Sequence, residues 1–194
     1  MRAWRCPCCA GEAQGLLHRR GLLGAALGLA AASVLPPAAM AQLITGGAPR
    51  RLAIQRMVTN ESFDGIYWQD GRYDREALNR LNWVLRDPTR DEATPMDPRL
   101  FDVLFTMAER LDATEGYQVI SGYRAPETNA AKARQSRRVS RASLHMSGMA
   151  ADVRLPGRDS YALARLAAEM QVGGVGLYRR DGFVHLDCGP ARRW

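Results

Sequence analysis

A run of fifteen residues without a charge, from Gly21 to Leu35, limits how much of this 194-residue chain is available for a folded domain. Arg19-Arg20 comes directly before the run, and Ala39-Met40-Ala41 follows it with small residues at the two positions that a signal peptidase recognises. The run is too short to cross a membrane as a helix, which needs about 20 apolar residues. This pattern predicts an export signal over residues 1–41.

The paired arginines before an alanine-rich segment are typical of a twin-arginine leader, which exports folded proteins. The rest of that motif is imperfect, because His18 precedes the pair and Gly21-Leu22-Leu23 follows it. The alternative is a signal anchor that stays attached to the membrane. We expect twin-arginine export, with no stable membrane insertion once the signal is removed.

Charge and cysteine content narrow the function classes open to the rest of the chain. Four arginines and one glutamate lie in residues 1–41, so +4 of the formal net charge of +7 belongs to residues 42–194. This mild positive charge is compatible with an anionic polymer such as cell wall. No basic tract is interleaved with aromatic residues, so we expect no nucleic-acid partner. Outside the signal, Cys188 is the single cysteine and cannot form an internal disulfide, so the fold depends on its hydrophobic core.

Residues 42–51 are expected to form a flexible lead-in to one folded domain over residues 52–194. Hydrophobic spacing in this domain predicts strands mixed with amphipathic helices. Because the elements do not follow a strict strand–helix–strand repeat, we expect an α+β fold with a small antiparallel sheet packed against helices. The strands are expected at 52–58, 63–68, 117–123, 150–155, 174–178 and 183–187, and the helices after Asp74 and Asp97, at 128–136 and at 160–170.

The domain contains only two histidines, and the residues near them suggest a metal site. His145 is followed seven residues later by Asp152, which suits a ligand in a loop and a ligand on a strand, with Gly148 allowing a turn between them. The alternation of side chains along a strand puts His185 and Asp187 on one face. Two neutral imidazoles and one carboxylate are a standard set for catalytic zinc with an open fourth position. His145, Asp152 and His185 are therefore candidate ligands for Zn²⁺.

Two further residues are candidates for chemistry beside such an ion. Asp187 is the candidate general base, because a carboxylate that does not bind the metal must take a proton from water. Arg124, which follows a predicted strand, is the candidate for stabilising an oxyanion. The alternatives are histidines with a structural role, an arginine in a surface ion pair, and an aspartate that only orients a histidine ligand. A cysteine peptidase is disfavoured, since Cys188 points away from His185 if the strand continues.

The domain also carries a set of short motifs, which are Ser121-Gly122-Tyr123-Arg124, Thr128-Asn129, the segment from His145 to Asp152, Gly173-Gly174-Val175-Gly176, Phe183-Val184-His185 and Gly189-Pro190-Ala191-Arg192-Arg193-Trp194. Together they resemble periplasmic murein endopeptidases of the YcbK/MepK type, within the wider group of lysostaphin-like, D-Ala-D-Ala and hedgehog-type zinc peptidases. The resemblance covers essentially all of residues 42–194. It implies a hedgehog/D-Ala-D-Ala-peptidase-like fold, zinc held by His145, Asp152 and His185, Arg124 near the scissile carbonyl, and hydrolysis of peptidoglycan cross-links in the periplasm.

Ser121, Tyr123 and Ser143 are the candidate substrate-binding residues of such an enzyme. In one respect the sequence departs from the wider group, in which several relatives carry a catalytic Glu or Asp three residues before the last histidine ligand. Gly182 stands at that position here, so Asp187 remains the candidate base. The departure leaves two alternatives open, namely a non-catalytic zinc-bearing wall-binding protein and a D,D- or L,D-carboxypeptidase of the same fold.

Overall fold

The computed structural model describes residues 47–171 and 173–194, and the predicted export signal lies outside the described residues. The strands are β1 (Arg50–Arg56), β2 (Ser62–Gln69), β3 (Arg72–Tyr73), β4 (Tyr117–Ser121), β5 (Ala150–Arg154), β6 (Gly174–Tyr178), β7 (Phe183–Asp187) and β8 (Arg192–Arg193). The helices are α2 (Arg75–Val84), α3 (Pro98–Arg110), α4 (Pro126–Gln135) and α5 (Ser160–Met170), with a short 3-10 helix η1 (Leu144–Ser147). None of these helices is long and apolar enough to cross a membrane.

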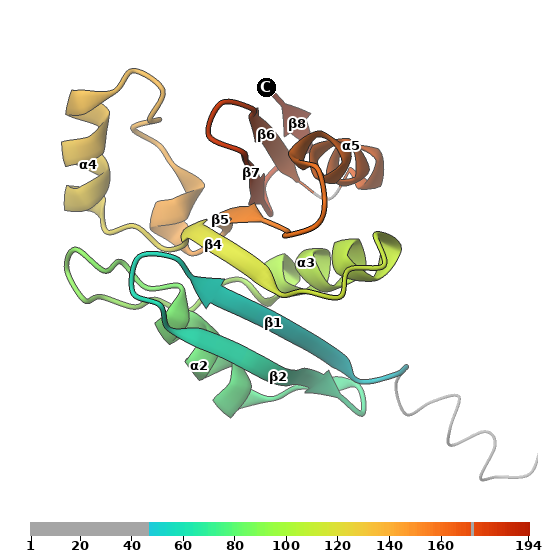
Figure 1. Cartoon of the computed structure of the whole chain (residues 1–194). Coiled ribbons are helices and arrows are strands. Elements are labelled where there is room, and N and C mark those ends of the chain that lie inside the picture. Colours follow the sequence, from blue (N-terminus) through green and yellow to red (C-terminus); the bar gives the residue numbers. More distant parts are fainter. Residues whose placement is uncertain (1–46, 172) are drawn as a thin grey trace, which may run out of the picture. The chain divides into compact units, whose positions relative to one another are not determined.

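The strands form one sheet in the order β3-β2-β1-β4-β5-β7-β6-β8, packed against helices, which confirms the α+β class (Figure 1). The sheet is larger than the sequence predicts and is not purely antiparallel, because β1 pairs with β4 and β6 with β8 in parallel. The chain between β1 and β4 contains α2 and α3. A connection of this length lets the two strands run in the same direction.

The first strand begins earlier than expected, since β1 includes Arg50 and Arg51, which the sequence analysis placed in the flexible lead-in. Arg50 forms an ion pair of 2.6 Å with Asp102 of α3, and its guanidinium lies 4.4 Å from the centre of the Trp68 ring. These contacts anchor the start of the strand. A search for apolar alternation misses them, because they are made by charged side chains.

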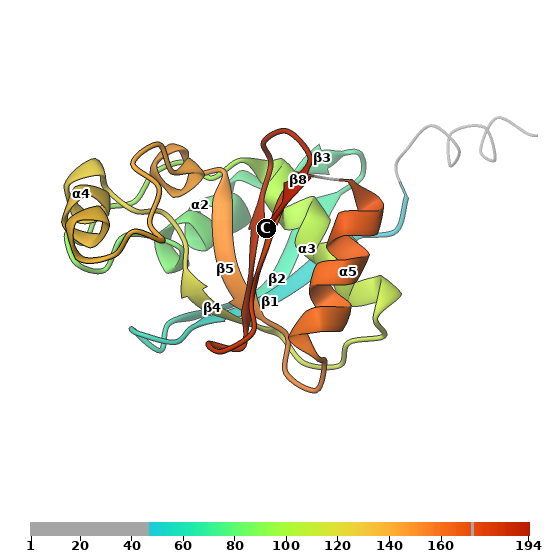
Figure 2. The ribbon, with the colours of Figure 1, turned by 90° about the horizontal axis from the view of Figure 1, so that it is seen from above.

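Three helices start where the sequence predicts, because an aspartate caps each one. The carboxylates of Asp74, Asp97 and Asp159 accept hydrogen bonds from backbone N–H groups in the first turns of α2, α3 and α5. Viewed from above, α3 and α5 lie on one side of the central strands, while α4 stands apart on the other (Figure 2). The capped helices supply buried apolar side chains to a single core with the sheet.

Alternation along the central strands separates a core face from a polar face. Val153 of β5 and Leu186 of β7 are buried in the hydrophobic core. Their neighbours Asp152 and His185 therefore point to the opposite face of the sheet. This face carries the candidate functional site.

Candidate metal centre

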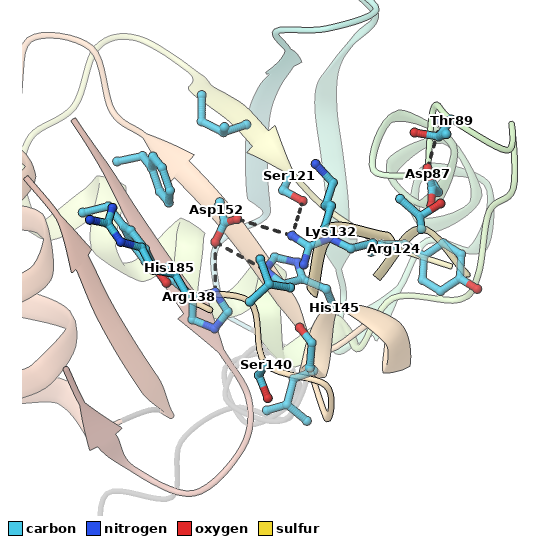
Figure 3. A pocket seen from close by; sticks show the side chains of 18 of the residues that line it. Asp87, Thr89, Ser121, Arg124, Lys132, Arg138, Ser140, His145, Asp152 and His185 are labelled. Atoms are coloured by element: carbon cyan, nitrogen blue, oxygen red, sulfur yellow. Dashed lines mark hydrogen bonds and ion pairs between the residues drawn. The ribbon is translucent and has the colours of Figure 1, made fainter. Parts of the chain in front are cut away.

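Three side chains meet at one point on the polar face. His145, Asp152 and His185 are buried, and each offers one ligand atom within 4.8 Å of the others. Asp152 Oδ1 lies 2.9 Å from His185 Nδ1 and 3.3 Å from His145 Nε2 (Figure 3). Two ligand atoms that each lie about 2.0–2.1 Å from a tetrahedral zinc ion are separated by about 3.3 Å. The three residues therefore fit a single ion of this kind.

The register of the sheet brings two of the ligands together. Asp152 on β5 is paired directly with His185 on β7, so their side chains are neighbours on the same face. On the other side of β5, a shift in register after Val119 pairs Ser121 with Asp152. A bulge of this kind redirects the side chains that follow it. Ser121 consequently joins the polar face, although Val119 is in the core.

His145 reaches the site from η1, and the chain turns sharply after it. Gly148 has φ = 66°, and a Cβ atom there would lie 2.6 Å from the carbonyl oxygen of Pro95. The turn at Gly148 is the one that the sequence predicts. Nδ1 of His145 lies 2.7 Å from the carbonyl oxygen of Gly122. A proton on Nδ1 is donated to this carbonyl, which leaves Nε2 free to bind a metal.

Electrostatic interactions among the three residues favour the ligand form of Asp152. Burial alone would raise the pKa of this carboxyl, but His145 and His185 hold it well below its usual range. Asp152 is therefore ionised at neutral pH and can bind a cation without first losing a proton.

Asp187 lies behind His185, outside the lining of the adjoining cavity. Its Oδ2 is 3.1 Å from Nε2 of His185, and its two oxygens also accept hydrogen bonds from the backbone N–H groups of Gly174 and Gly189 and from Arg192. Burial alone would raise the pKa of this carboxyl, but these hydrogen bonds hold it below its usual range. Because its side chain is 0% exposed, this placement favours the orienting role over the role of general base.

Arg124 lies beside the candidate metal ligands, and its guanidinium is buried. Its Nη2 is 3.2 Å from Ser121 Oγ and 4.0 Å from Asp152 Oδ2, and its Nη1 donates to Asn129 Oδ1 at 3.1 Å. Its Nε has no hydrogen-bond partner among the described residues. Burial lowers the pKa of the guanidinium, and the charge of Asp152 opposes this effect. Sequence reasoning assigned no role to Asn129, although it used Thr128-Asn129 as a motif.

The candidate metal ligands line a cavity of about 750 Å³. Ser121, Tyr123 and Ser143, the three candidate substrate-binding residues, all line it. The hydroxyl of Tyr123 donates to Glu92 at 2.9 Å, which fixes the ring at the cavity wall. The structure therefore brings these candidates to the same cavity as the predicted ligands and Arg124.

An aromatic wall closes the cavity beside His185, and sequence reasoning did not assign it. The Trp194 ring centre is 5.2 Å from that of His185, and Tyr178 and Phe183 line the same cavity. The indole occupies the space above Gly176, where a Cβ atom would lie 2.6 Å from the ring. In the sequence, the motif that ends in Trp194 supported the family resemblance, but it did not predict that Trp194 lines the cavity.

Cys188 belongs to the hydrophobic core, on the side of the sheet away from the ligands. Burial raises the pKa of its thiol to about 12. A thiolate nucleophile is therefore disfavoured at neutral pH.

A carboxylate between two imidazoles, with a buried arginine beside it and a cavity in front, defines the site of a metal-dependent hydrolase on an α+β fold. The Peptidase_M15_2 family model, described as peptidoglycan L,D-endopeptidase MepK, matches residues 45–194. The chain belongs to this peptidase family.

Relatives with curated names agree with this assignment. The chain is 38% identical over 180 residues to the peptidoglycan L,D-endopeptidase MepK of Escherichia coli (strain K12), across 91% of this chain and 97% of the relative. It is 34% identical over 172 residues to the probable peptidoglycan L,D-endopeptidase MepK of Haemophilus influenzae, across 88% of this chain and 90% of the relative. A comparison with solved structures gave no significant match.

Proposed function

We propose that this chain is a zinc-dependent endopeptidase that hydrolyses peptide cross-links in peptidoglycan. The observation that carries the proposal is the meeting of His145, Asp152 and His185 at one point of a cavity large enough for a peptide. The names of the relatives in Escherichia coli and Haemophilus influenzae support the same substrate.

The chain's own residues have distinct tasks in this reaction. Zinc, when bound, supplies a water of lowered pKa and polarises the scissile carbonyl. The far ring nitrogens of His145 and His185 are held by the Gly122 carbonyl and by Asp187, so each imidazole presents its other nitrogen to the ion. Arg124 stabilises the negative charge that develops on the carbonyl oxygen.

Internal cleavage is part of the proposal because both relatives are named as endopeptidases. Asp87 and Thr89 lie beyond Arg124 at one end (Figure 3), and Trp194 lies against His185 at the other. The cavity therefore extends from the metal centre toward Asp87 and Thr89 and is bounded by aromatic side chains beside His185. Ser121, Tyr123 and Ser143 are its proposed contacts along the wall.

The test of this function uses purified protein and cross-linked muropeptide dimers. We expect cleavage by the zinc-loaded protein, loss of cleavage after complete chelation, and recovery when zinc is added back. Mass spectrometry of the products identifies the bond that is cut. Cleavage that persists without zinc would contradict the proposal. Binding to sacculi without any soluble product would support the non-catalytic wall-binding alternative.

We assign Asp187 an orienting role rather than that of the base, and the proton of the attacking water would pass to solvent, because bound zinc would lower the pKa of that water to about 7. Replacing it by Asn removes the charge that fixes the His185 ring, and we expect zinc affinity to fall by about 10- to 100-fold. Titration with a zinc indicator measures this change. Asp181→Asn, at an exposed position on the turn before β7, is the matched control. Unchanged zinc affinity together with lost turnover would return Asp187 to the role of base.

Export to the periplasm remains part of the proposal. It is supported by the sequence pattern of residues 1–41 and by the location of peptidoglycan outside the inner membrane. The twin-arginine route is inferred from Arg19-Arg20 and the alanine-rich apolar segment that follows the pair.

A further inference from the structure

The last strand of the sheet, β8, brings two side chains back to the metal centre. It lies beside β6 at one end of the sheet (Figure 1), and the parallel pairing of these strands puts Arg192 opposite Gly174. The backbone of Trp194 continues this pairing with a hydrogen bond of 3.1 Å to β6. On its other side β6 pairs with β7, where Gly176 lies opposite His185. Arg192 and Trp194, two residues apart, therefore lie on the same face of the sheet as His185.

Two glycines of β6 leave the space that these side chains occupy. A Cβ atom at Gly174 would lie 2.6 Å from Nη1 of Arg192, and one at Gly176 would lie 2.6 Å from the indole of Trp194. Atoms in a close-packed protein do not approach so closely, so a side chain at either glycine would displace its neighbour on β8. The motif Gly173-Gly174-Val175-Gly176 thus allows side chains of β8 to reach across β6 to β7.

Arg192 reaches His185 through Asp187. Its Nη1 and Nη2 lie 3.1 and 2.7 Å from Oδ1 and Oδ2 of Asp187, so the guanidinium holds both carboxylate oxygens. Nη1 also donates to the carbonyl oxygen of Pro190 at 3.1 Å. Oδ2 of Asp187 in turn lies 3.1 Å from Nε2 of His185. This chain of contacts restricts the rotation of the carboxylate and of the imidazole beside it.

Trp194 confines the same imidazole from a second direction. The centres of the Trp194 and His185 rings are 5.2 Å apart, with 48° between their planes, which is within the usual range of aromatic pairs. The indole N–H donates to the hydroxyl of Tyr178 at 3.4 Å, and the Arg192 guanidinium lies 5.2 Å from the centre of the indole. The two side chains of β8 therefore contact each other as well as the group that they confine.

We propose that Arg192 and Trp194 are positioning residues of the metal centre, which hold the His185 ring so that its Nδ1 faces a metal ion beside Asp152. This inference rests on the proposed function, and it extends the orienting role of Asp187 to a strand that contributes no ligand. Arg192 acts through Asp187, whereas Trp194 acts directly on the ring. A ligand that is already ordered need not lose its freedom when the ion binds, so the ion is bound more tightly.

Zinc affinity, measured by competition with a chelating indicator, tests the role of Arg192. We expect Arg192→Gln to weaken zinc binding by about 10-fold, because Asp187 loses its charged partner but keeps its hydrogen bonds from two backbone N–H groups. Arg192→Lys should give an intermediate affinity, since it keeps the charge without the planar fork. Arg193→Gln is the matched control, because Arg193 is the next residue of β8 and is exposed. This variant should bind zinc as the wild type does.

A double-mutant cycle distinguishes action through Asp187 from an independent effect on the protein. If Arg192 acts through Asp187, Arg192→Gln should add little to the loss caused by Asp187→Asn, and the double variant should bind zinc within about 2-fold of Asp187→Asn alone. Losses that multiply would overturn this role of Arg192. Wild-type zinc affinity in Arg192→Gln would overturn it as well.

Two substitutions of Trp194 test the second contact. Trp194→Phe keeps an aromatic ring beside His185 and should bind zinc nearly as the wild type does. Trp194→Ala should weaken zinc binding by about 2- to 10-fold, the usual worth of one aromatic pair. Gly176→Ala should reproduce this loss without changing Trp194 itself, because the added methyl group displaces the indole. Equal zinc affinity in Trp194→Ala and Trp194→Phe would overturn the role of Trp194.

Nuclear magnetic resonance of the zinc-free protein separates this inference from the proposed function. We expect one sharp set of His185 ring signals in the wild type and in Arg193→Gln. In Arg192→Gln and Trp194→Ala these signals should be broadened by exchange between ring orientations. This result supports the inference even if no cross-link is hydrolysed. Equally sharp signals in all four proteins would overturn the inference, even where hydrolysis by the zinc-loaded protein supports the proposed function.

Discussion

Replacing Asp152 with Asn is expected to remove bound zinc and to lower the rate of cross-link cleavage by about a thousandfold or more. The reason is that Asp152 Oδ1 faces both His145 and His185, at 3.3 and 2.9 Å, and supplies the only negative charge among the three ligands. A bound metal contributes several kcal/mol of transition-state stabilisation, and about 4 kcal/mol corresponds to a thousandfold in rate. Zinc content by mass spectrometry and the initial rate of cleavage measure the two effects.

Asp64→Asn is the matched control for this variant. This substitution makes the same chemical change on β2, where the side chain of Asp64 is exposed and pairs with Arg51. Zinc content and rate should both stay at the wild-type level. Full zinc content and normal turnover in Asp152→Asn would remove Asp152 from the ligand set.

Replacing Arg124 with Gln is expected to lower kcat by about 100- to 1000-fold, the usual cost of losing a donor to an oxyanion. Its guanidinium is held by Ser121 and Asn129, so its position beside the site is fixed before substrate binds. KM should change much less than kcat, because the negative charge on the carbonyl oxygen develops only in the transition state. Steady-state kinetics with a defined dimer separate the two parameters.

Zinc content decides how a defect in Arg124→Gln is interpreted. We expect about one zinc per chain, because Arg124 Nη2 is 4.0 Å from Asp152 and is not a ligand. Loss of zinc together with activity would indicate that Arg124 maintains the metal centre and does not act on the substrate. Unchanged kcat would leave its contacts with Ser121 and Asn129 purely structural.

Much of the fold can be predicted because local chemistry decides where its elements begin and which way their side chains point. The carboxylates of Asp74 and Asp97 cap their helices by accepting hydrogen bonds from backbone N–H groups that lie within three residues of them in the sequence. Alternation alone places His185 on the face opposite Leu186. These features need no knowledge of distant parts of the chain.

The remaining features depend on pairings between distant segments. The bulge after Val119 sends Ser121 to the polar face, and it exists only because β4 and β5 are paired in that register. Alternation puts Asp187 on the same face as His185, but it does not say which ring nitrogen the carboxylate meets. Nothing near Arg192 in the sequence distinguishes it from the arginine that follows it, because its contacts with Asp187 depend on the pairing of β8 with β6.

The row of paired residues across β4, β5, β7 and β6 has a consequence for how such enzymes diversify. Ser121, Asp152, His185 and Gly176 are successive partners in this row, so the hydrogen-bonded pairing of the strands sets the spacing of two candidate metal ligands. The cavity lining also includes residues of the segment 138–143, which lies between α4 and η1 and outside the sheet. We expect that mutations in that segment change the lining of the cavity without changing the spacing of the two candidate ligands.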